Sequence, residues 1–394
     1  MPFPDSPEFL QRGTPAYRRA TWALFCAGLA TFALLYCVQP ILPLLAAQFG
    51  VSAASSSLAL SLSTIGLAAC LLLTGALSES WGRKPVMLAA LAAATVLGVA
   101  CICVDSWGPL LACRLLLGIA LAGLPALAMA YVGEEFSPQA LPTAMGLYIG
   151  GNALGGLVGR LVAGVLADVG GWRLALGGIA AMALVATLLF AWLLPPSRHF
   201  RAQPLSLGGL LGNFGRHLQN PALRQLFLQS FLLMGGFVAI FNYLAFHLQA
   251  PPFGLSSTVV GLLSAVYLVG IASANLGGRL VARWSAGAVQ RGGIALMVVG
   301  VAGCAVAWLP AVMLGLALVT AGFFAAHAVA SGQVGQKAHG ARAQASALYL
   351  SAYYLGSSVV GYAAGYLWEH AGWLPLLAAL AALFLLAGWR AGRN

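Results

Sequence analysis

Long apolar runs recur along the whole chain, and they restrict its fold more than any other feature of the sequence. Each run holds about 18 residues or more, and a helix of that length crosses about 30 Å of hydrocarbon. Only 7% of the 394 residues are charged, whereas 61% are hydrophobic and the mean hydropathy is +0.92. These values exclude an ordinary soluble domain. A transmembrane barrel would need short alternating segments, so we predict an all-α membrane protein.

The runs predict twelve transmembrane helices. We expect them at about 20–46, 53–77, 85–104, 109–132, 144–167, 173–194, 225–249, 257–281, 292–310, 312–334, 344–367 and 373–389. The 49 glycines are spread through the runs, which favours helices that pack closely through small residues. All seven cysteines also lie in the runs, where cysteine behaves as a small hydrophobe. We therefore expect no disulfide, metal site or cofactor.

The few charged residues predict the orientation. If the N-terminus lies in the cytoplasm, every Lys and Arg outside the spans except Arg173 falls on the inner side, and only Arg114 and Arg160 lie inside spans. This distribution obeys the positive-inside rule, so we expect both termini in the cytoplasm. The net charge of +11 then describes topology. It gives no support to nucleic-acid binding, because the basic residues form no single stripe.

One long inner loop divides the chain. It runs from Pro195 to Arg224 and contains the stretch LSLGGLLGNFGRHL, which predicts a helix resting on anionic lipid headgroups. A ligand site in this loop is the alternative. The predicted organisation is a cytoplasmic segment at 1–19, a six-helix bundle at 20–194, a linker at 195–224 and a second six-helix bundle at 225–394.

The two bundles have related sequences. When the chain is shifted by 201 residues, LYIGGNALGG…AGVLADVGGW aligns with LYLSAYYLGS…AGYLWEHAGW, and Asp168 falls on Glu369. Near the start of each bundle, FGVS from Phe49 matches FGLS from Phe253. Repeats with an even number of spans keep their orientation. We therefore predict two parallel repeats related by an axis along the membrane normal, with a site between them.

The loop between the second and third predicted spans reads GALSESWGRKP. It resembles the loop signature of the major facilitator superfamily, Gly-x-Leu-x-Asp-Arg-x-Gly-Arg-Arg/Lys. The matching residues are Gly75, Leu77, Gly82, Arg83 and Lys84. Glu79 replaces the aspartate and Ser80 replaces the first arginine. The resemblance implies a twelve-helix transporter in which this loop latches a gate.

The resemblance assigns Glu79 and Arg83 to this gating role, within a gating loop that also includes Gly75, Gly82 and Lys84. Ordinary positive-inside topology is the alternative reason for Arg83 and Lys84.

The fourth predicted span contains CRLLLG, in which Arg114 and Gly118 resemble the Arg-x-x-x-Gly signature of proton-coupled exporters in this superfamily. By that resemblance, Arg114 helps to pass or tune protons.

The fifth predicted span is similar to the exporters' Gly-x-x-x-Gly-Pro-x-x-Gly-Gly pattern. Gly151, Gly155 and Gly159 match it, whereas Gly156 replaces the proline and Arg160 replaces the last glycine. The chain as a whole resembles the arabinose-efflux-permease-like group of bacterial inner-membrane transporters.

Arg114 and Arg160 are predicted at similar depths, ~8 Å and ~12 Å below the outer surface at about 1.5 Å per residue. A charge at the bilayer centre costs roughly 2.5–3.5 kcal/mol on insertion scales, so both are functional candidates. All eight Asp and Glu residues lie in loops, termini or helix ends, and the sequence offers no deep counter-ion. We predict that the pair faces a cavity and attracts an anionic or hydroxyl-rich substrate. The alternative is outward snorkelling toward Asp105 and Asp168.

Other polar side chains complete the candidate site, because resemblance implies that the first and fourth spans of each half line the cavity. The candidate substrate residues are Tyr36, Gln39, Arg114, Asn152, Arg160, Asn242, Tyr243 and His327. The candidates for proton transfer are Arg114, Glu134, Glu135 and His327. His327 is alternatively a packing residue, and Glu134 and Glu135 alternatively complement the nearby basic loops.

These features predict a secondary transporter and not an enzyme. We expect a monomer in a bacterial inner membrane that exports a small solute or drug-like compound in exchange for protons. The alternatives are a uniporter, or an organic-anion or sugar transporter without proton coupling. A membrane-embedded enzyme or sensor is disfavoured, because the sequence shows no nucleophile elbow, metal-ligand spacing or deep Asp/Glu/His cluster.

Overall fold

The computed structural model describes residues 9–200, 207–338 and 340–391, and leaves out the side chains at positions 75, 76, 79, 207–211, 390 and 391. The described ranges are helical almost throughout, and an isolated bridge between Leu10 and Phe136 is the one β-pairing within them. The prediction of an all-α protein is therefore confirmed.

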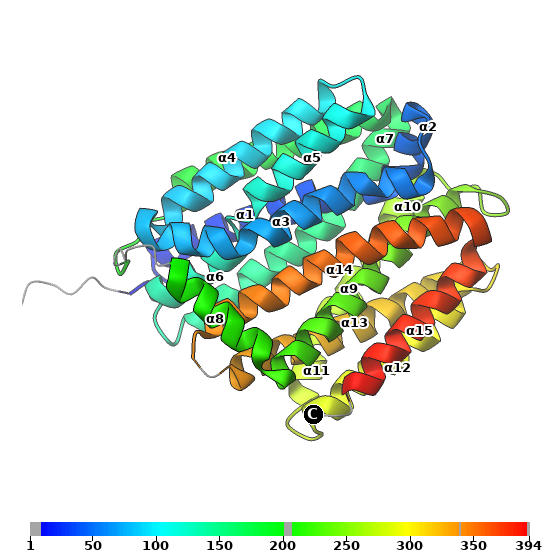
Figure 1. The fold of residues 1–394 in the computed structure, drawn as a ribbon. Coiled ribbons are helices and arrows are strands. Elements are labelled where there is room, and N and C mark those ends of the chain that lie inside the picture. The colour runs from blue at the N-terminus through cyan, green and yellow to red at the C-terminus, as the bar shows by residue number, and fades with distance from the viewer. Residues whose placement is uncertain (1–8, 201–206, 339, 392–394) are drawn as a thin grey trace, which may run out of the picture.

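The first half comprises α1 (Pro15–Tyr36), η1 (Gln39–Ile41), α2 (Leu42–Phe49), α3 (Ala53–Trp81), α4 (Arg83–Ile102), α5 (Trp107–Leu121), α6 (Pro125–Glu135) and α7 (Leu141–Leu193). The second half comprises α9 (Pro221–Gln249), α10 (Ser257–Leu262), η2 (Leu263–Val266), α11 (Tyr267–Leu280), α12 (Ala286–Cys304), α13 (Leu309–Lys337), α14 (Arg342–Ala371) and α15 (Trp373–Ala391). Helix α8 (Leu207–Gln219) lies between them in the chain. In Figure 1, α8 marks one end of the bundle, and α2 and α10 mark the other. We call these the inner and outer ends, following the predicted orientation.

Nine helical segments in the described ranges are long and apolar enough to cross a membrane. One of them, α7, has 53 residues and contains a break at Gly170 and Gly171, where the backbone leaves helical geometry. The predicted fifth and sixth spans lie on either side of this break. The segment Trp373–Trp389 in α15 is apolar but shorter. The multi-pass character is thus confirmed, and the count of twelve crossings stays a prediction.

The ninth predicted span is displaced along the chain. We expected it at 292–310, whereas α12 covers Ala286–Cys304. Ser285 begins this helix, because its hydroxyl accepts a hydrogen bond from the amide of Ala288. Hydropathy placed the span too far along because Arg291 lies in the early turns of the helix and apolar residues continue beyond Cys304.

Helices α1 and α7 pack through a glycine seam. Gly151, Gly155 and Gly159 recur at four-residue spacing on one face of α7, and the backbone of α1 from Phe25 to Ala33 lies so close that a Cβ atom at any of them would collide with it. Small residues at this spacing allow helix backbones to approach closely in a membrane. The seam therefore presses the fifth predicted span onto the first and places Arg160, next to Gly159, against it.

The two halves meet mainly through two helix pairs. Helix α3 lies beside α14 along much of its length, and α7 packs extensively against the short α10 at the outer end (Figure 1). Helix α11 continues α10 toward the inner end but contacts α7 much less. The halves are therefore joined along α3 and α14, whereas α7 packs on the second half mainly at the outer end.

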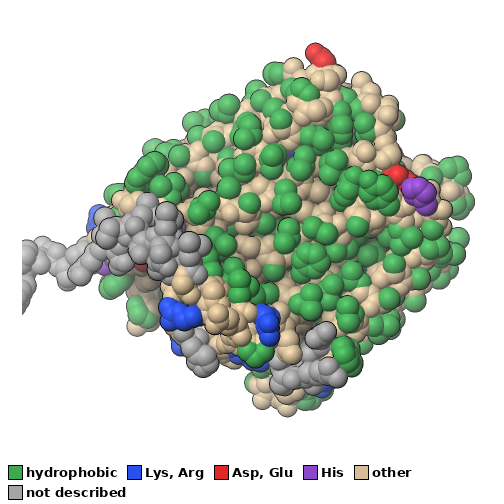
Figure 2. All heavy atoms as spheres, in the orientation of Figure 1, with side chains coloured by type: hydrophobic (Ala, Val, Ile, Leu, Met, Phe, Trp, Pro, Cys, Tyr) green, Lys and Arg blue, Asp and Glu red, His purple; other side chains and the backbone are tan. Residues whose placement is uncertain are grey.

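The surface agrees with a membrane environment. Figure 2 shows apolar side chains spread over the flank of the bundle, and most of the basic side chains visible on this face lie near the end that carries α8. Large exposed apolar residues such as Leu188, Trp192 and Leu314 are more than half accessible. Such a surface requires a lipid solvent, since a soluble protein rarely exposes an apolar area of this extent.

The first predicted span is interrupted after Tyr36, and Arg114 holds the interruption in place. Its Nη1 and Nη2 atoms donate hydrogen bonds to the carbonyl oxygens of Leu34 (2.8 Å) and Leu35 (2.7 Å) in the last turn of α1. Its Nε donates to the carbonyl oxygen of Ala59 in α3 (2.7 Å). Carbonyls at the end of a helix have no intrahelical partner, so this guanidinium supplies the donors that the break removes.

The expectation that Arg114 could snorkel toward Asp105 is wrong. Asp105 instead accepts a hydrogen bond from Arg173 Nη2 at 2.6 Å, on the exposed outer end. The reason is that the carbonyls of the interrupted helix lie within reach of the buried guanidinium and satisfy it there.

The variant Arg114→Lys should be less stable than the wild type. An ammonium group cannot present a planar fork to three carbonyls, and each buried acceptor left without a partner costs about 1–3 kcal/mol. We expect a lower midpoint of thermal unfolding in detergent. The measurement detects unfolding through the reaction of newly exposed cysteines with a fluorescent maleimide. Arg173→Lys, in the exposed pair, is the control. An unchanged midpoint for Arg114→Lys would show that these bonds do not stabilise the interruption.

Candidate functional site

A pair of amides joins the two halves at the interruption of the first predicted span. Gln39 in η1 donates a hydrogen bond from Nε2 to Oδ1 of Asn242 in α9, at 2.8 Å. Both side chains are buried. The two residues are 203 positions apart, which is close to the repeat offset, so they occupy matching places in the two halves. The pseudo-symmetry axis therefore passes near this bond.

Arg160 extends the amide pair into a network. Its Nε donates to Oε1 of Gln39 (2.6 Å), its Nη1 donates to the carbonyl oxygen of Gly156 (2.6 Å), and its Nη2 donates to the hydroxyl of Tyr267 (2.9 Å). Gln39 belongs to the first half and Tyr267 to the second. The guanidinium is only 2% exposed, so this network is a dry polar contact between the halves.

Aromatic rings enclose the same guanidinium. The Cζ atom of Arg160 lies 4.7 Å from the ring centroids of Tyr36 and Tyr267, and 5.5 Å from that of Phe241. Cation–π attraction at these distances stabilises a desolvated cation. None of the ion pairs within the described ranges includes Arg160.

Arg160 does not snorkel toward Asp168, contrary to the alternative expected from the sequence. Both carboxylate oxygens of Asp168 are used at the start of α10, where they accept hydrogen bonds from the amides of Ser257 (3.1 Å) and Thr258 (2.8 Å). The side chain of Arg160 turns inward instead, because Gln39 and Tyr267 offer acceptors there.

The predicted substrate residues divide into two groups. Tyr36, Gln39, Arg160 and Asn242 lie together, and the structure adds Tyr267, which sequence reasoning missed. No described hydrogen bond joins the other candidates to this network. Asn152 packs against Gly28 of α1, Tyr243 donates a hydrogen bond to the carbonyl of Gly361 (2.8 Å), and Arg114 binds α1 and α3.

His327 lies in the second half, in α13, and no described hydrogen bond joins it to the Arg160 network. Its Nδ1 is 3.0 Å from the hydroxyl of Tyr349, and its ring stacks on Phe323 at 5.6 Å and lies 4.8 Å from Tyr353. An imidazole bonded to a hydroxyl within aromatic rings can take up or release a proton only if the solvent reaches it.

At the inner end, the gating-loop residues contact the ends of neighbouring helices. Arg83 Nη2 is 2.7 Å from Oε1 of Glu134 at the end of α6, and Arg83 also donates to the hydroxyl of Ser78. Gly82 adopts a positive φ of 91° between α3 and α4, and Lys84 donates to the carbonyl of Leu194. Gly75 lies in α3; the side chain of Glu79 is outside the described part.

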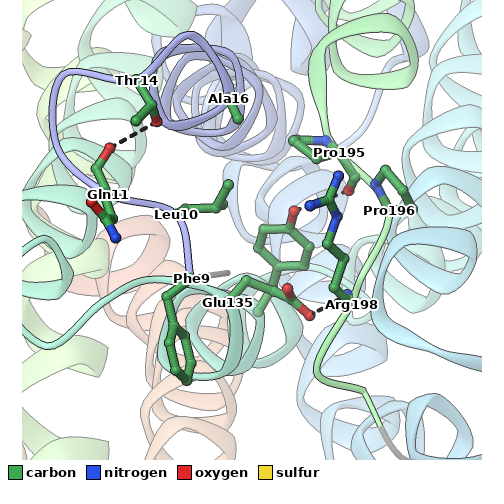
Figure 3. A pocket seen from close by; sticks show the side chains of 10 residues that line it. Phe9, Leu10, Gln11, Thr14, Ala16, Glu135, Pro195, Pro196 and Arg198 are labelled. Atoms are coloured by element: carbon green, nitrogen blue, oxygen red, sulfur yellow. Dashed lines mark hydrogen bonds between the residues drawn. The ribbon is translucent and has the colours of Figure 1, made fainter. Parts of the chain in front are cut away.

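Glu135 fastens the start of the linker to the first half. Its carboxylate accepts hydrogen bonds from the amides of Arg198 (2.8 Å) and His199 (2.9 Å) and lies 3.1 Å from the ring Nδ1 of His199. Figure 3 shows this carboxylate at the edge of a pocket of about 160 Å³. The pocket is lined by Phe9, Leu10, Gln11, Thr14, Ala16, Tyr131, Glu135, Pro195, Pro196 and Arg198. Glu134 and Glu135 thus both contact basic loops, which is the role that the sequence analysis offered as the alternative to proton transfer.

At the outer end, two carboxylates cap helices of the opposite half. Asp168 in α7 caps α10 through the two amides given above, and Glu369 in α14 accepts a hydrogen bond from the amide of Ala54 in α3 at 2.6 Å. These are the two acids that the internal repeat aligns. One turn earlier, Gly164 and Gly365 allow the same close approach, since a Cβ atom at either would collide with the capped helix.

Within the described ranges, no group of three or more His, Cys, Asp or Glu side chains could hold a metal ion. The chemistry available at the network is hydrogen bonding and charge recognition.

Comparisons with known proteins agree with this architecture. The family model described as Major Facilitator Superfamily matches residues 24–361. The chain is 45% identical over 380 residues to the inner membrane transport protein YnfM of Escherichia coli (strain K12), covering 96% of this chain and 91% of that protein. It is 43% identical over 384 residues to the uncharacterized MFS-type transporter YybF of Bacillus subtilis (strain 168), covering 98% and 95%.

A solved structure shows the same fold. It is that of a bacterial homolog to the human lysosomal transporter Spinster, in an inward-facing and occupied conformation, with a TM-score of 0.79 and 15% identity over 96% of this chain and 97% of that one. The chain belongs to the major facilitator superfamily of membrane transporters.

Proposed function

We propose that the protein is a secondary active transporter of the bacterial inner membrane that exports a small solute in exchange for protons, with its substrate site at the Gln39–Arg160–Asn242 network. The observation that carries the site is the position of this network: it is buried, it joins both halves, and it lies near the pseudo-symmetry axis. Movement of one half against the other must break its bonds. A substrate that supplies replacement bonds would favour that movement.

The outer caps give the movement a mechanism. A carboxylate that accepts hydrogen bonds from the first amides of a helix neutralises unpaired donors and interacts favourably with the helix dipole. Asp168 and Glu369 make such contacts at two of the places where the halves meet at the outer end. Breaking both would let the outer ends separate while the inner ends approach, which is the exchange that alternating access requires.

Removal of the two caps, in the variant Asp168→Ala/Glu369→Ala, should shift the population toward outward-open states. Loss of a helix cap costs about 0.5–2 kcal/mol, so two caps change the ratio of states roughly fivefold or more. Spin labels at exposed positions 169 in α7 and 366 in α14, placed in a background without the native cysteines, report the separation of the outer ends by double electron–electron resonance. We expect a new, longer distance population.

Asp105→Ala is the matched control for this experiment, because Asp105 also lies at the outer end but binds Arg173 within the same half. A distance distribution that is the same in the double variant as in the control would contradict the latch role of the caps.

We assign proton coupling to ionisable groups in the gating loop or beside the interface between the halves. Glu134 pairs with Arg83 between α6 and the gating loop, and His327 bonds to Tyr349 between α13 and α14. Helix α14 also packs on α3 of the opposite half, so a change of charge at His327 acts beside the moving interface. Arg114, by contrast, is held by three carbonyls and positions the interruption.

Transport by purified protein in liposomes tests this proposal. Uptake of sugars, organic acids and cationic dyes by the liposomes is measured with and without an imposed pH gradient. We expect accumulation that follows the gradient, and a loss of that dependence in His327→Gln or Glu134→Gln, with His370→Gln at the exposed outer end as the control. Transport that ignores the pH gradient would overturn proton coupling and indicate a uniporter.

A further inference from the structure

We propose that the substrate is an organic acid with an apolar body, and that its carboxylate binds between Arg160 and Asn242. This inference rests on the proposed substrate site. It adds the chemical class of the ligand, which the names of the two curated relatives do not specify.

The first argument is charge. Arg160 is buried and has hydrogen-bond partners that are all uncharged: an amide, a backbone carbonyl and a phenol. No described ion pair includes it. A guanidinium that has left water without a counter-ion is far more favourable when an anion reaches it, and a hydrogen bond from Arg to a carboxylate is charge-assisted. A cationic ligand would add a second positive charge to the same dry site.

The second argument is the pattern of unused donors. Within the described ranges, the buried hydroxyls of Tyr36 and Ser61 and the Nδ2 of Asn242 have no hydrogen-bond partner. Tyr36 lies against the guanidinium, and Asn242 is already bonded to Gln39 through its oxygen. An amide nitrogen can only donate, and so it requires an acceptor from elsewhere. The Tyr36 ring beside the cation and the Asn242 amide beside Gln39 thus carry buried donors that an acceptor with negative charge can use.

The third argument is the shape of the present partner. The Gln39 amide is planar and has the same number of polar atoms as a carboxylate. One of them accepts from Arg160 and the other contacts Asn242. A ligand carboxylate in the place of this amide would accept from Arg160 through one oxygen. Rotation of the Asn242 side-chain amide would then direct Nδ2 to the second oxygen, which uses the donor that now lacks a partner.

The fourth argument is the difference between the halves. The position that matches Arg160 in the internal repeat is Gly361. A Cβ atom there would lie 3.5 Å from Asn242 Nδ2 and 3.8 Å from Ser61 Oγ. One donor from each half, Asn242 and Ser61, therefore lies near this position, which carries no cation. A ligand with one charged end matches this asymmetry, whereas a dianion with two equal ends does not.

The apolar body is indicated by the surrounding rings. Phe241 covers Arg160 on one side, and Phe237 stacks on Phe323 with ring centroids 4.2 Å apart. Tyr267 and Phe324 continue this aromatic wall, with centroids 5.6 Å apart. A sugar would leave its hydroxyls against these rings without partners, so the wall favours an aromatic or aliphatic acid.

The test uses matched ligands that differ in one group. Purified protein in lipid nanodiscs is titrated by calorimetry with benzoate, 1-naphthoate and octanoate, and with the corresponding amides and amines. We expect at least one acid to bind about tenfold or more tightly than its amide, and the amines to bind least. Equal or undetectable binding within all three acid–amide pairs, or preference for an amine, overturns the inference.

Two variants locate the binding. Arg160→Gln should remove the preference for acid over amide. Gly361→Ala adds a methyl group beside Asn242 and Ser61 without a steric collision, so it should keep the unfolding midpoint of the wild type and weaken acid binding several-fold. Gly335→Ala, where a Cβ atom meets nothing within 4 Å, is the control. Acid preference that survives in both Arg160→Gln and Gly361→Ala would place the acid elsewhere and overturn the inference.

Failure of this inference can be separated from failure of the proposed function. If liposomes transport a sugar or a cationic dye and no acid is preferred, the transporter proposal stands and the substrate class is wrong. If the acids bind as expected but no compound crosses the membrane, the substrate class stands and the transport proposal fails.

Discussion

A guanidinium surrounded by hydrocarbon must find its hydrogen-bond acceptors within the protein, and the two buried arginines meet this requirement differently. Arg114 uses backbone carbonyls of α1 and α3, all within the first half. These bonds complete the interrupted first span, and the interruption directs Gln39 to the second half. Arg160 then bonds to Gln39 and to Tyr267 across the interface. The first arginine thus creates the local structure on which the second depends.

The duplicated chain keeps its symmetry at the outer end and loses it at the centre. Asp168 and Glu369 have the same role in both halves, and Gln39 and Asn242 retain matching amides. The match ends at Arg160, whose counterpart is Gly361. Two halves that rock against each other need equivalent contacts at the places where they separate. A ligand with one charged end needs a site with one cation, so the asymmetry belongs at the centre.

The sequence allowed the helices to be predicted because the cost of exposing polar backbone to lipid leaves few alternatives. It also showed that Arg160 has no equivalent in the second half. It could not decide the direction of the Arg160 side chain. Asp168 and Gln39 both offer acceptors, and only the folded structure shows that α10 uses both carboxylate oxygens of Asp168. Tyr267 was missed because one tyrosine in an apolar run has no periodic signal. Its role depends on a hydrogen bond with Arg160, which lies 107 positions earlier in the chain.

The contacts at the centre and at the outer end differ in the cost of breaking them. The caps at Asp168 and Glu369 lie near the surface, where water can replace a lost hydrogen bond. The bonds among Arg160, Gln39 and Asn242 are dry, and a buried donor left unpaired costs far more than the bond contributes when formed. The transporter without substrate can therefore keep its halves together at the centre only while the Gln39 amide bonds to both Arg160 and Asn242. In the proposed mechanism, a carboxylate that displaces the Gln39 amide takes over this role, so that ligand binding itself controls when the halves can separate.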